Sequence, residues 1–238
     1  MASQEGVKKL ETVLLVSQNE TSEVRSLLIK GGFKLVERNP DFIVCYGGDG
    51  TVLFAERNFP QIPKLIIKRT KICRKCDYTF YDMNNVISKI RDEKFVIKKE
   101  IKIETRIKNE KLIGLNEIQV HTKLPIYAIR FSVSVGKQRF ENLIGDGVIV
   151  ATPFGSTGYY KSTGGKQFEE GLGVAFNNLH NKNVESFVVD GDSLVEVKMN
   201  RGPAWVLADN NERFLQLESD DAITIKKSES LANLIYVL

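Results

Sequence analysis

The spacing of apolar residues changes near residue 99, and this change constrains the fold more than any other feature of the sequence. Before it, short apolar runs alternate with stretches whose apolar residues recur at helical spacing. That order is typical of parallel strands joined by helices. We expect strands at 12–17, 41–46 and 63–68, and helices at 21–30, 51–58 and 83–90. Residues 1–98 are therefore predicted to form a Rossmann-like α/β domain.

From residue 99 the apolar residues alternate with polar ones, as in strands with one buried face. The stretch 101–120 reads as two strands joined by a turn at Asn109–Glu110, and further short β-rich segments follow Gly145. We expect an antiparallel β-sandwich over residues 99–226. The apolar C-terminal segment, residues 227–238, is predicted to return as a strand to the core of the first domain.

The composition excludes several classes of protein. Of 238 residues, 42% are hydrophobic and 27% are charged, as in ordinary globular proteins. The 34 basic and 30 acidic residues form no long basic block, so we expect small anionic ligands and no nucleic-acid partner. No run approaches the roughly 20 apolar residues of a membrane helix, and the N-terminus lacks the apolar core of a signal peptide. The sequence predicts a cytoplasmic protein with no membrane partner.

Three cysteines are too few for a disulfide framework. Cys45 lies inside a predicted strand as a small hydrophobe. Cys73 and Cys76 form a CxxC pair, which could bind zinc or cycle as a dithiol, but the only other soft ligands are His121 and His180. A plain surface turn is the favoured interpretation of this pair.

The sequence Gly-Gly-Asp-Gly-Thr at 47–51 connects a predicted buried strand to a helix. Glycines tolerate positive φ and close approach, so backbone N–H groups can face a phosphate at the start of the helix. A carboxylate there repels phosphate unless it binds a metal or takes a proton. Asp49 is thus a candidate general base or magnesium ligand in phosphoryl transfer. The alternative is an ordinary turn in which Asp49 caps the helix.

A second unusual stretch, residues 145–165, combines glycines, hydroxyl residues and the adjacent Tyr159 and Tyr160 after a strand. Such a loop can wrap a polar ligand, with hydroxyls and amides on its ribose or phosphates and a tyrosine face on its base. The alternative is a surface loop without function. No Walker A motif or dinucleotide-binding fingerprint is present.

Three segments, in this order and at these distances, resemble the NAD kinase family, the inorganic polyphosphate/ATP-NAD kinases. They are GGDGT at 47–51, LNE at 115–117 and GDGVIVATPFGSTGYYKSTGG at 145–165. Diacylglycerol kinases carry a motif similar to the first, but the third is specific. The resemblance spans residue 42 to the C-terminus. It implies an α/β domain of the NAD kinase/diacylglycerol kinase type, a β-sandwich and a last segment that returns to the first domain.

The resemblance implies a reaction, the transfer of a phosphoryl group from ATP or polyphosphate to the adenosine ribose 2′-hydroxyl of NAD. It also implies magnesium (Mg²⁺) bridged through the donor phosphates, so no residue is assigned as a metal ligand. Members of the family are usually homodimers or homotetramers, and we expect the same of this chain.

Roles for particular residues follow from the resemblance. Asp49 would take the proton of the hydroxyl. The phosphate and nucleotide site would include Gly48, Gly50 and Thr51. The NAD site would be formed by Asn116 and Glu117 at the nucleoside, Asp146 at the nicotinamide end, and Thr157, Gly158, Tyr159 and Ser162 at the adenosine part.

The sequence also departs from the family pattern. Phe154 stands where threonine is usual and Gly158 where alanine is usual, while Asp209 matches a family aspartate with Asn210 in place of the following glycine. In segment 69–82 the family's glycine- and asparagine-bearing turn is missing. Two alternatives to an active NAD kinase therefore stay open: a catalytically weak relative that binds NAD or NADP as a regulatory module, and a lipid kinase of the same superfamily.

Overall fold

The computed structural model describes residues 9–69, 78–181 and 183–238. The chain divides into two compact units. The α/β unit consists of Met1–Glu100 and Ala232–Leu238, and the β unit of Ile101–Leu231. Strands β6 (Phe95–Ile107) and β17 (Ala222–Val237) have residues in both.

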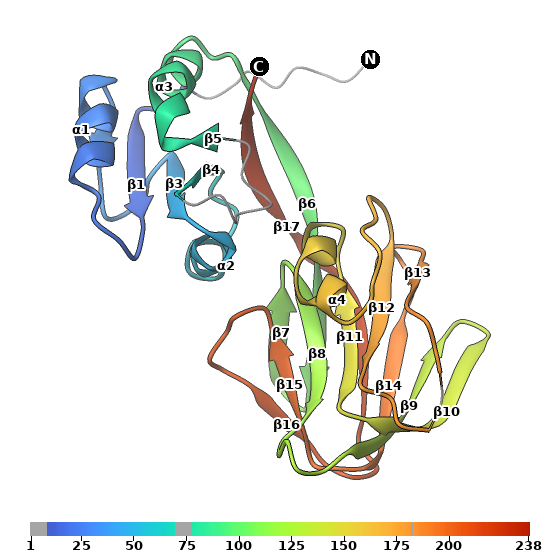
Figure 1. Ribbon diagram of the computed structural model, residues 1–238. Helices are drawn as coiled ribbons and strands as arrows, with labels where there is room; N and C mark the ends of the chain where they lie inside the picture. The colour runs from blue at the N-terminus through green and yellow to red at the C-terminus, as the bar shows by residue number, and fades with distance from the viewer. Residues whose placement is uncertain (1–8, 70–77, 182) are drawn as a thin grey trace. The chain divides into compact units, whose positions relative to one another are not determined.

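The α/β unit is built on a parallel sheet (Figure 1). Its strands are β1 (Thr12–Val16), β2 (Lys34–Leu35), β3 (Phe42–Gly47), β4 (Lys64–Lys68) and β5 (Tyr78–Thr79). They lie in the order β2-β1-β3-β4, and the far side of β4 pairs with β5 at one end and with the last part of β17 at the other. The parallel α/β arrangement is confirmed, and Leu234 of β17 pairs with Lys64 of β4.

Helices cover both faces of this sheet. They are α1 (Ser22–Lys30), α2 (Asp49–Asn58) and α3 (Met83–Arg91), the last preceded by the short turn η1 (Phe80–Asp82). Phe42 and Val44 pack with α1 and α3, whereas the intervening Ile43 and Cys45 are buried on the face that α2 covers. Burial raises the pKa of the Cys45 thiol to about 12, as befits a residue that serves only packing.

The β unit is an antiparallel sandwich, as predicted. Its first sheet has the order β13-β12-β11-β8-β15-β16. These strands are β8 (Glu117–Thr122), β11 (Gly147–Ala151), β12 (Leu172–Asn177), β13 (Phe187–Val189), β15 (Ala204–Ala208) and β16 (Leu215–Leu217). Two short helical turns, η2 (Phe154–Thr157) and α4 (Tyr159–Ser162), follow β11.

The second sheet of the β unit contains β10 (Gln138–Gly145), β9 (Ile129–Val135), β14 (Val195–Arg201) and the first part of β17, with β6 and β7 (Glu110–Gly114) beyond it. Alternate residues of both sheets, such as Ile118, Val148, Phe131 and Val197, form one apolar core between them. Among the described residues, none of the helices is long and apolar enough to cross a bilayer.

Three local predictions were wrong. The stretch 101–120 contains parts of three strands rather than two, because the chain leaves β7 at Gly114 and enters the other sheet at Glu117. The turn before β7 lies at Lys108–Asn109, where Lys108 has a φ of 54°. The C-terminal segment, expected as a strand from residue 227, is part of the longer strand β17, which begins at Ala222.

A buried polar cluster joins β6, β7 and β17 within the β unit. Glu104 accepts a hydrogen bond from the Ser228 hydroxyl at 2.7 Å and forms an ion pair with Lys111. Burial raises the pKa of Glu104, but the hydrogen bonds from Lys111 and Ser228 outweigh it, so the pKa lies below the ordinary carboxyl value. The ionised form of Glu104 is therefore the one that the fold stabilises.

Candidate functional site

The first group of candidate residues lies where β3 meets α2. The helix begins at Asp49 with Gly48 as its N-cap, and the Thr51 N–H donates to the Gly48 carbonyl at 3.0 Å. The N-cap position is held by Gly48, so Asp49 is not the N-cap residue of α2. Asp49 instead occupies the first turn, partly exposed, followed by the exposed Gly50. Its carboxylate stands at the positive end of the helix dipole.

Gly47 and Gly48 differ in how much space surrounds each of them. A Cβ on Gly47 would lie 2.2 Å from Thr51 Oγ1, so the fold itself excludes a larger residue. The Thr51 side chain packs in this contact and is only 8% exposed. Among the described residues, a Cβ on Gly48 would meet no atom within 4 Å, and its φ of −113° suits any residue. Neither glycine adopts the positive φ expected from the sequence, and the described residues leave open space beside Gly48.

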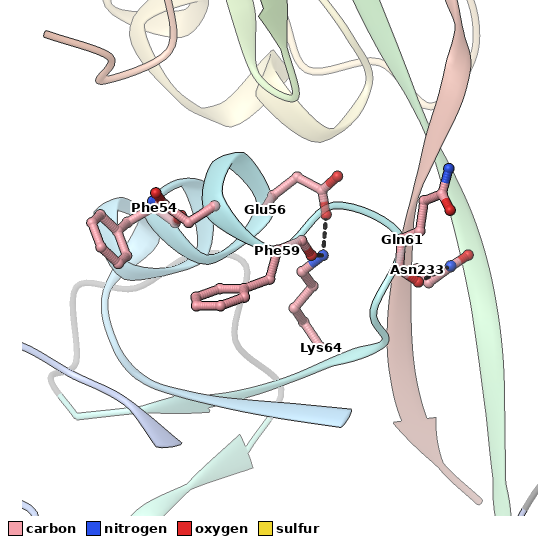
Figure 2. Close-up of polar contacts among 7 residues, drawn as sticks. Phe54, Glu56, Phe59, Gln61, Lys64 and Asn233 are labelled. Atoms are coloured by element: carbon pink, nitrogen blue, oxygen red, sulfur yellow. Dashed lines mark hydrogen bonds and ion pairs between the residues drawn. The ribbon is translucent and has the colours of Figure 1, made fainter. Parts of the chain in front are cut away.

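A buried ion pair fixes α2 on the sheet (Figure 2). Lys64, the first residue of β4, is fully buried and donates both to the carboxylate of Glu56 and to the Phe59 carbonyl, the latter at 2.7 Å. Glu56 lies seven residues after Asp49, which is within about 20° of the same helix face at 100° per residue. The Glu56–Lys64 contact therefore also sets the direction in which the first turn of α2 points.

The second group belongs to the β unit and begins with the turn between β7 and β8. The Asp209 carboxylate accepts hydrogen bonds from the backbone N–H groups of Leu115 at 2.8 Å, Asn116 at 2.7 Å and Glu117 at 3.1 Å. Asp209 has a φ of 50°, and its own N–H donates to the Glu117 carbonyl at 3.0 Å. Asp209 thus shapes the turn that carries Asn116 and Glu117, each only 5% exposed.

The segment after β11 packs against this turn. The Thr152 N–H donates to the Asn116 carbonyl at 2.9 Å, and a Cβ on Gly155 would lie only 2.0 Å from the same oxygen. A Cβ on Gly158 would lie 3.5 Å from Asn116 Nδ2 and 3.6 Å from Glu117 Oε2. The structure therefore brings Asn116, Glu117 and Gly158 together. Thr152 and Gly155 hold this arrangement. They lie inside the 145–165 motif, but nothing in the sequence marks these two residues as contacts of Asn116.

Thr157 ends η2 directly before Gly158, and Ser162 ends α4 with its side chain exposed. Of the two tyrosines, Tyr160 is buried against Phe168, with ring centroids 5.4 Å apart. Burial raises the pKa of Tyr160. Tyr159 keeps 36% of its surface exposed, so it is the tyrosine whose ring is available to a base.

Asp146 lies at the other end of β11 from this cluster. Gly147 pairs with His121 whereas Ala151 pairs with Glu117, so the two ends are on the order of 15 Å apart at about 3.4 Å per residue. The Asn178 amide donates to Asp146 Oδ2 at 2.7 Å. The sequence analysis missed Asn178, which lies in an ordinary polar stretch.

Asp146 and Asn178 line one wall of a surface hollow of about 530 Å³. Its other walls are formed by Pro125, Ile126, Tyr127, Ala128, Leu179 and His180. Tyr159 connects the two ends of β11. It directly follows Gly158 at one end, and its hydroxyl accepts a hydrogen bond from Asn177 Nδ2 at 3.1 Å. At the other end, the Asn177 carbonyl accepts a hydrogen bond from the Asp146 N–H at 2.9 Å. The polar residues of the β unit therefore form an extended row, which suits a long ligand better than a compact one.

Comparison with known proteins identifies the family. Residues 115–237, more than half of the chain, match the family described as the ATP-NAD kinase C-terminal domain. The chain belongs to the NAD kinase family. An NAD kinase from Methanosphaera stadtmanae is 27% identical over 207 residues, which are 83% of this chain and 74% of that protein.

Solved structures agree with this assignment at the level of the fold. A yeast NADH kinase complexed with NADH superposes with a TM-score of 0.83 at 15% identity, covering 98% of this chain and 85% of that one. An Archaeoglobus fulgidus NAD kinase in complex with ATP gives a TM-score of 0.80 at 22% identity, with 96% and 93% covered. The NAD kinase fold therefore extends to the α/β unit, beyond the residues that the family match covers.

The described residues contain no group of three or more His, Cys, Asp or Glu side chains arranged to hold a metal ion. Cys73 and Cys76, together with most of the altered 69–82 segment, lie outside the described residues, so the predicted surface turn stays a prediction.

Proposed function

We propose that this chain is an NAD kinase, which transfers a phosphoryl group from ATP or polyphosphate to the adenosine ribose 2′-hydroxyl of NAD and so makes NADP. The observation that carries the proposal is the family match over residues 115–237. It is supported by Asp49 at the start of α2 beside the open space at Gly48. It is also supported by the row of polar residues along the β unit, whose length suits a dinucleotide.

Asp49 acts as the general base in this proposal. Its carboxylate takes the proton of the 2′-hydroxyl as the new O–P bond forms and the bond between the γ-phosphorus and the bridging oxygen of the donor breaks. Gly48, Gly50 and Thr51 hold the donor phosphates, chiefly through their backbone at the start of α2. Asn116 and Glu117 hold the nucleoside of NAD.

The rest of the acceptor site follows the same row. Thr157, Gly158, Tyr159 and Ser162 contact the adenosine part, and Asp146 the nicotinamide end. Mg²⁺ bound to the donor phosphates would neutralise charge that otherwise repels the attacking oxygen. The described residues fit such an ion because they leave space beside Gly48 for donor phosphates that carry it.

Three further properties belong to the proposal: dependence on magnesium, a cytoplasmic location and assembly as a homodimer or homotetramer. They rest on the resemblance and on the composition of the sequence. Light scattering of the purified protein and loss of turnover with a chelator test the assembly and the metal.

The deciding experiment measures NADP formation by purified protein with NAD, Mg²⁺ and ATP, and again with polyphosphate as donor. Turnover supports the kinase and names the donor. An Asp49→Asn variant keeps the size of the side chain but removes the base, so we expect kcat to fall at least 100-fold, in line with the roughly 10²–10⁴-fold contribution of such groups. Binding of NAD or NADP without turnover would instead favour the regulatory alternative, and phosphorylation of a lipid the second one.

A further inference from the structure

Arg69 of the α/β unit extends from the end of β4 toward Asn19, past the glycine loop at residues 47–51. Arg69 directly follows β4 and Asn19 lies in the connection after β1, and the guanidinium Nη1 of Arg69 donates a hydrogen bond to Asn19 Oδ1 at 2.9 Å. In the sheet, β3 lies between β1 and β4. The hydrogen bond therefore passes over the carboxyl end of β3, where Gly47 leads into Gly48.

The strand register places Arg69 beside the loop as well. Gly47 pairs with Lys68, and the Arg69 N–H donates to the Gly47 carbonyl at 3.3 Å. Strands β1 and β4 are roughly 10 Å apart, at about 4.8 Å per strand spacing. The Arg69 side chain must span much of this distance to reach Asn19. Its guanidinium therefore lies toward Asn19, across the carboxyl end of β3.

The chemistry of this arrangement suits a chain of phosphates. A guanidinium has five N–H donors in a planar fork, and the bond to Asn19 uses one of them. The fork matches phosphate oxygens and stays charged at every physiological pH. The backbone of Arg69 bonds to Gly47, which leads into Gly48 and the positive end of the α2 dipole.

We propose that Arg69 binds the phosphate chain of the phosphoryl donor and that Asn19 positions its guanidinium. This inference rests on the proposed function and deepens it. The ligand class is a chain of linked phosphates, whether it belongs to ATP or to polyphosphate. Arg69 is the first residue of segment 69–82, whose sequence departs from the family pattern.

The kinetic test compares wild type with Arg69→Gln at saturating NAD and varied ATP. A hydrogen bond to a charged group contributes about 1.5–3 kcal/mol, so the KM for ATP should rise on the order of 10- to 100-fold while the KM for NAD stays within about twofold. Arg69→Lys keeps the positive charge but not the planar guanidinium, so its KM for ATP should lie between those of wild type and Arg69→Gln. Asn19→Ala should raise the KM for ATP by a smaller factor. An unchanged KM for ATP in Arg69→Gln, or a raised KM for NAD alone, would overturn the proposal.

The control is Arg57→Gln, which removes an exposed arginine at the far end of α2 and should leave both KM values unchanged. Calorimetric binding of ATP and of tripolyphosphate to the same proteins without NAD provides a readout independent of turnover. Equal losses for both ligands in Arg69→Gln support contact with the phosphates. Loss of ATP binding alone would place Arg69 on the nucleoside and refute the proposal. If wild type makes no NADP at all, the proposed function fails, but the binding comparison still decides the role of Arg69.

Discussion

Replacing Lys64 with methionine should destabilise the protein far more than its position in a short strand implies. Methionine fills much of the same space but removes the cation that pairs with Glu56 and the donor that bonds the Phe59 carbonyl at 2.7 Å (Figure 2). Lys64 and Glu56 side chains are 0% and 5% exposed, so water cannot take the place of the lost partner. Removing one member of a buried pair costs about 3–5 kcal/mol, because a buried charge loses its compensation.

Thermal and urea unfolding would measure this change. For a chain of this size each kcal/mol lowers the Tm by roughly 2–4 °C, so we expect a drop of about 6–20 °C for Lys64→Met. The double variant Glu56→Leu/Lys64→Met removes both charges and should recover most of the lost stability, since an apolar replacement of a whole buried pair is often neutral or favourable.

The matched control is Lys94→Met. Lys94 pairs with Asp92 at 3.3 Å, but the two side chains are 63% and 53% exposed. Exposed pairs of this kind typically contribute about 0–1 kcal/mol, so the free energy of unfolding should hardly change. If Lys64→Met proved as mild as Lys94→Met, or if the double variant were as unstable as the single one, the reasoning from buried charge would be refuted.

Three other predictions concern the two units. Gly47→Ala should lower the free energy of unfolding, because its Cβ would lie 2.2 Å from Thr51 Oγ1. Gly48→Ala should leave the unfolding curve unchanged and raise only the KM for the phosphoryl donor. Asp209→Ala removes the acceptor of three backbone N–H groups and should raise the KM for NAD as well as lower the Tm. The pKa of Glu104 is lowered from 4.5, so its contribution to the free energy of unfolding is complete above pH 4.5 and is lost as the pH falls through the lowered pKa. In Glu104→Gln the free energy of unfolding should therefore fall less steeply as the pH is lowered, as urea unfolding at several acid pH values would show.

Much of the fold could be predicted from local pattern. The three expected strands and three expected helices of the α/β unit lie close to their predicted ranges, because apolar spacing and glycine stops are properties of neighbouring residues. The two-residue strands β2 and β5 were not expected. The division between β7 and β8 could not be found in the same way. It depends on Asp209, which lies more than ninety residues from the turn that it holds.

The candidate site shows the same limit. Its motifs led to Asn116, Glu117 and Gly158, which the structure brings together. The distance that separates Asp146 from them depends on strand register, which no motif records. Likewise, a lysine at the start of an apolar strand reads as an exposed end, and only the packing of α2 shows that Lys64 is buried with Glu56.

The return of β17 to the α/β unit has a consequence for biosynthesis. A ribosome makes β1 to β4 early, but the strand segment that pairs with Lys64 emerges only after the whole of Ile101–Leu231 has been translated. Until then β5 can cover only the Ile67–Lys68 end of that edge of β4, and the Lys64 end can pair with a strand of another chain. Part of the sheet edge therefore stays unpaired during most of the synthesis of the chain, and the α/β unit can be completed only after the β unit has been translated.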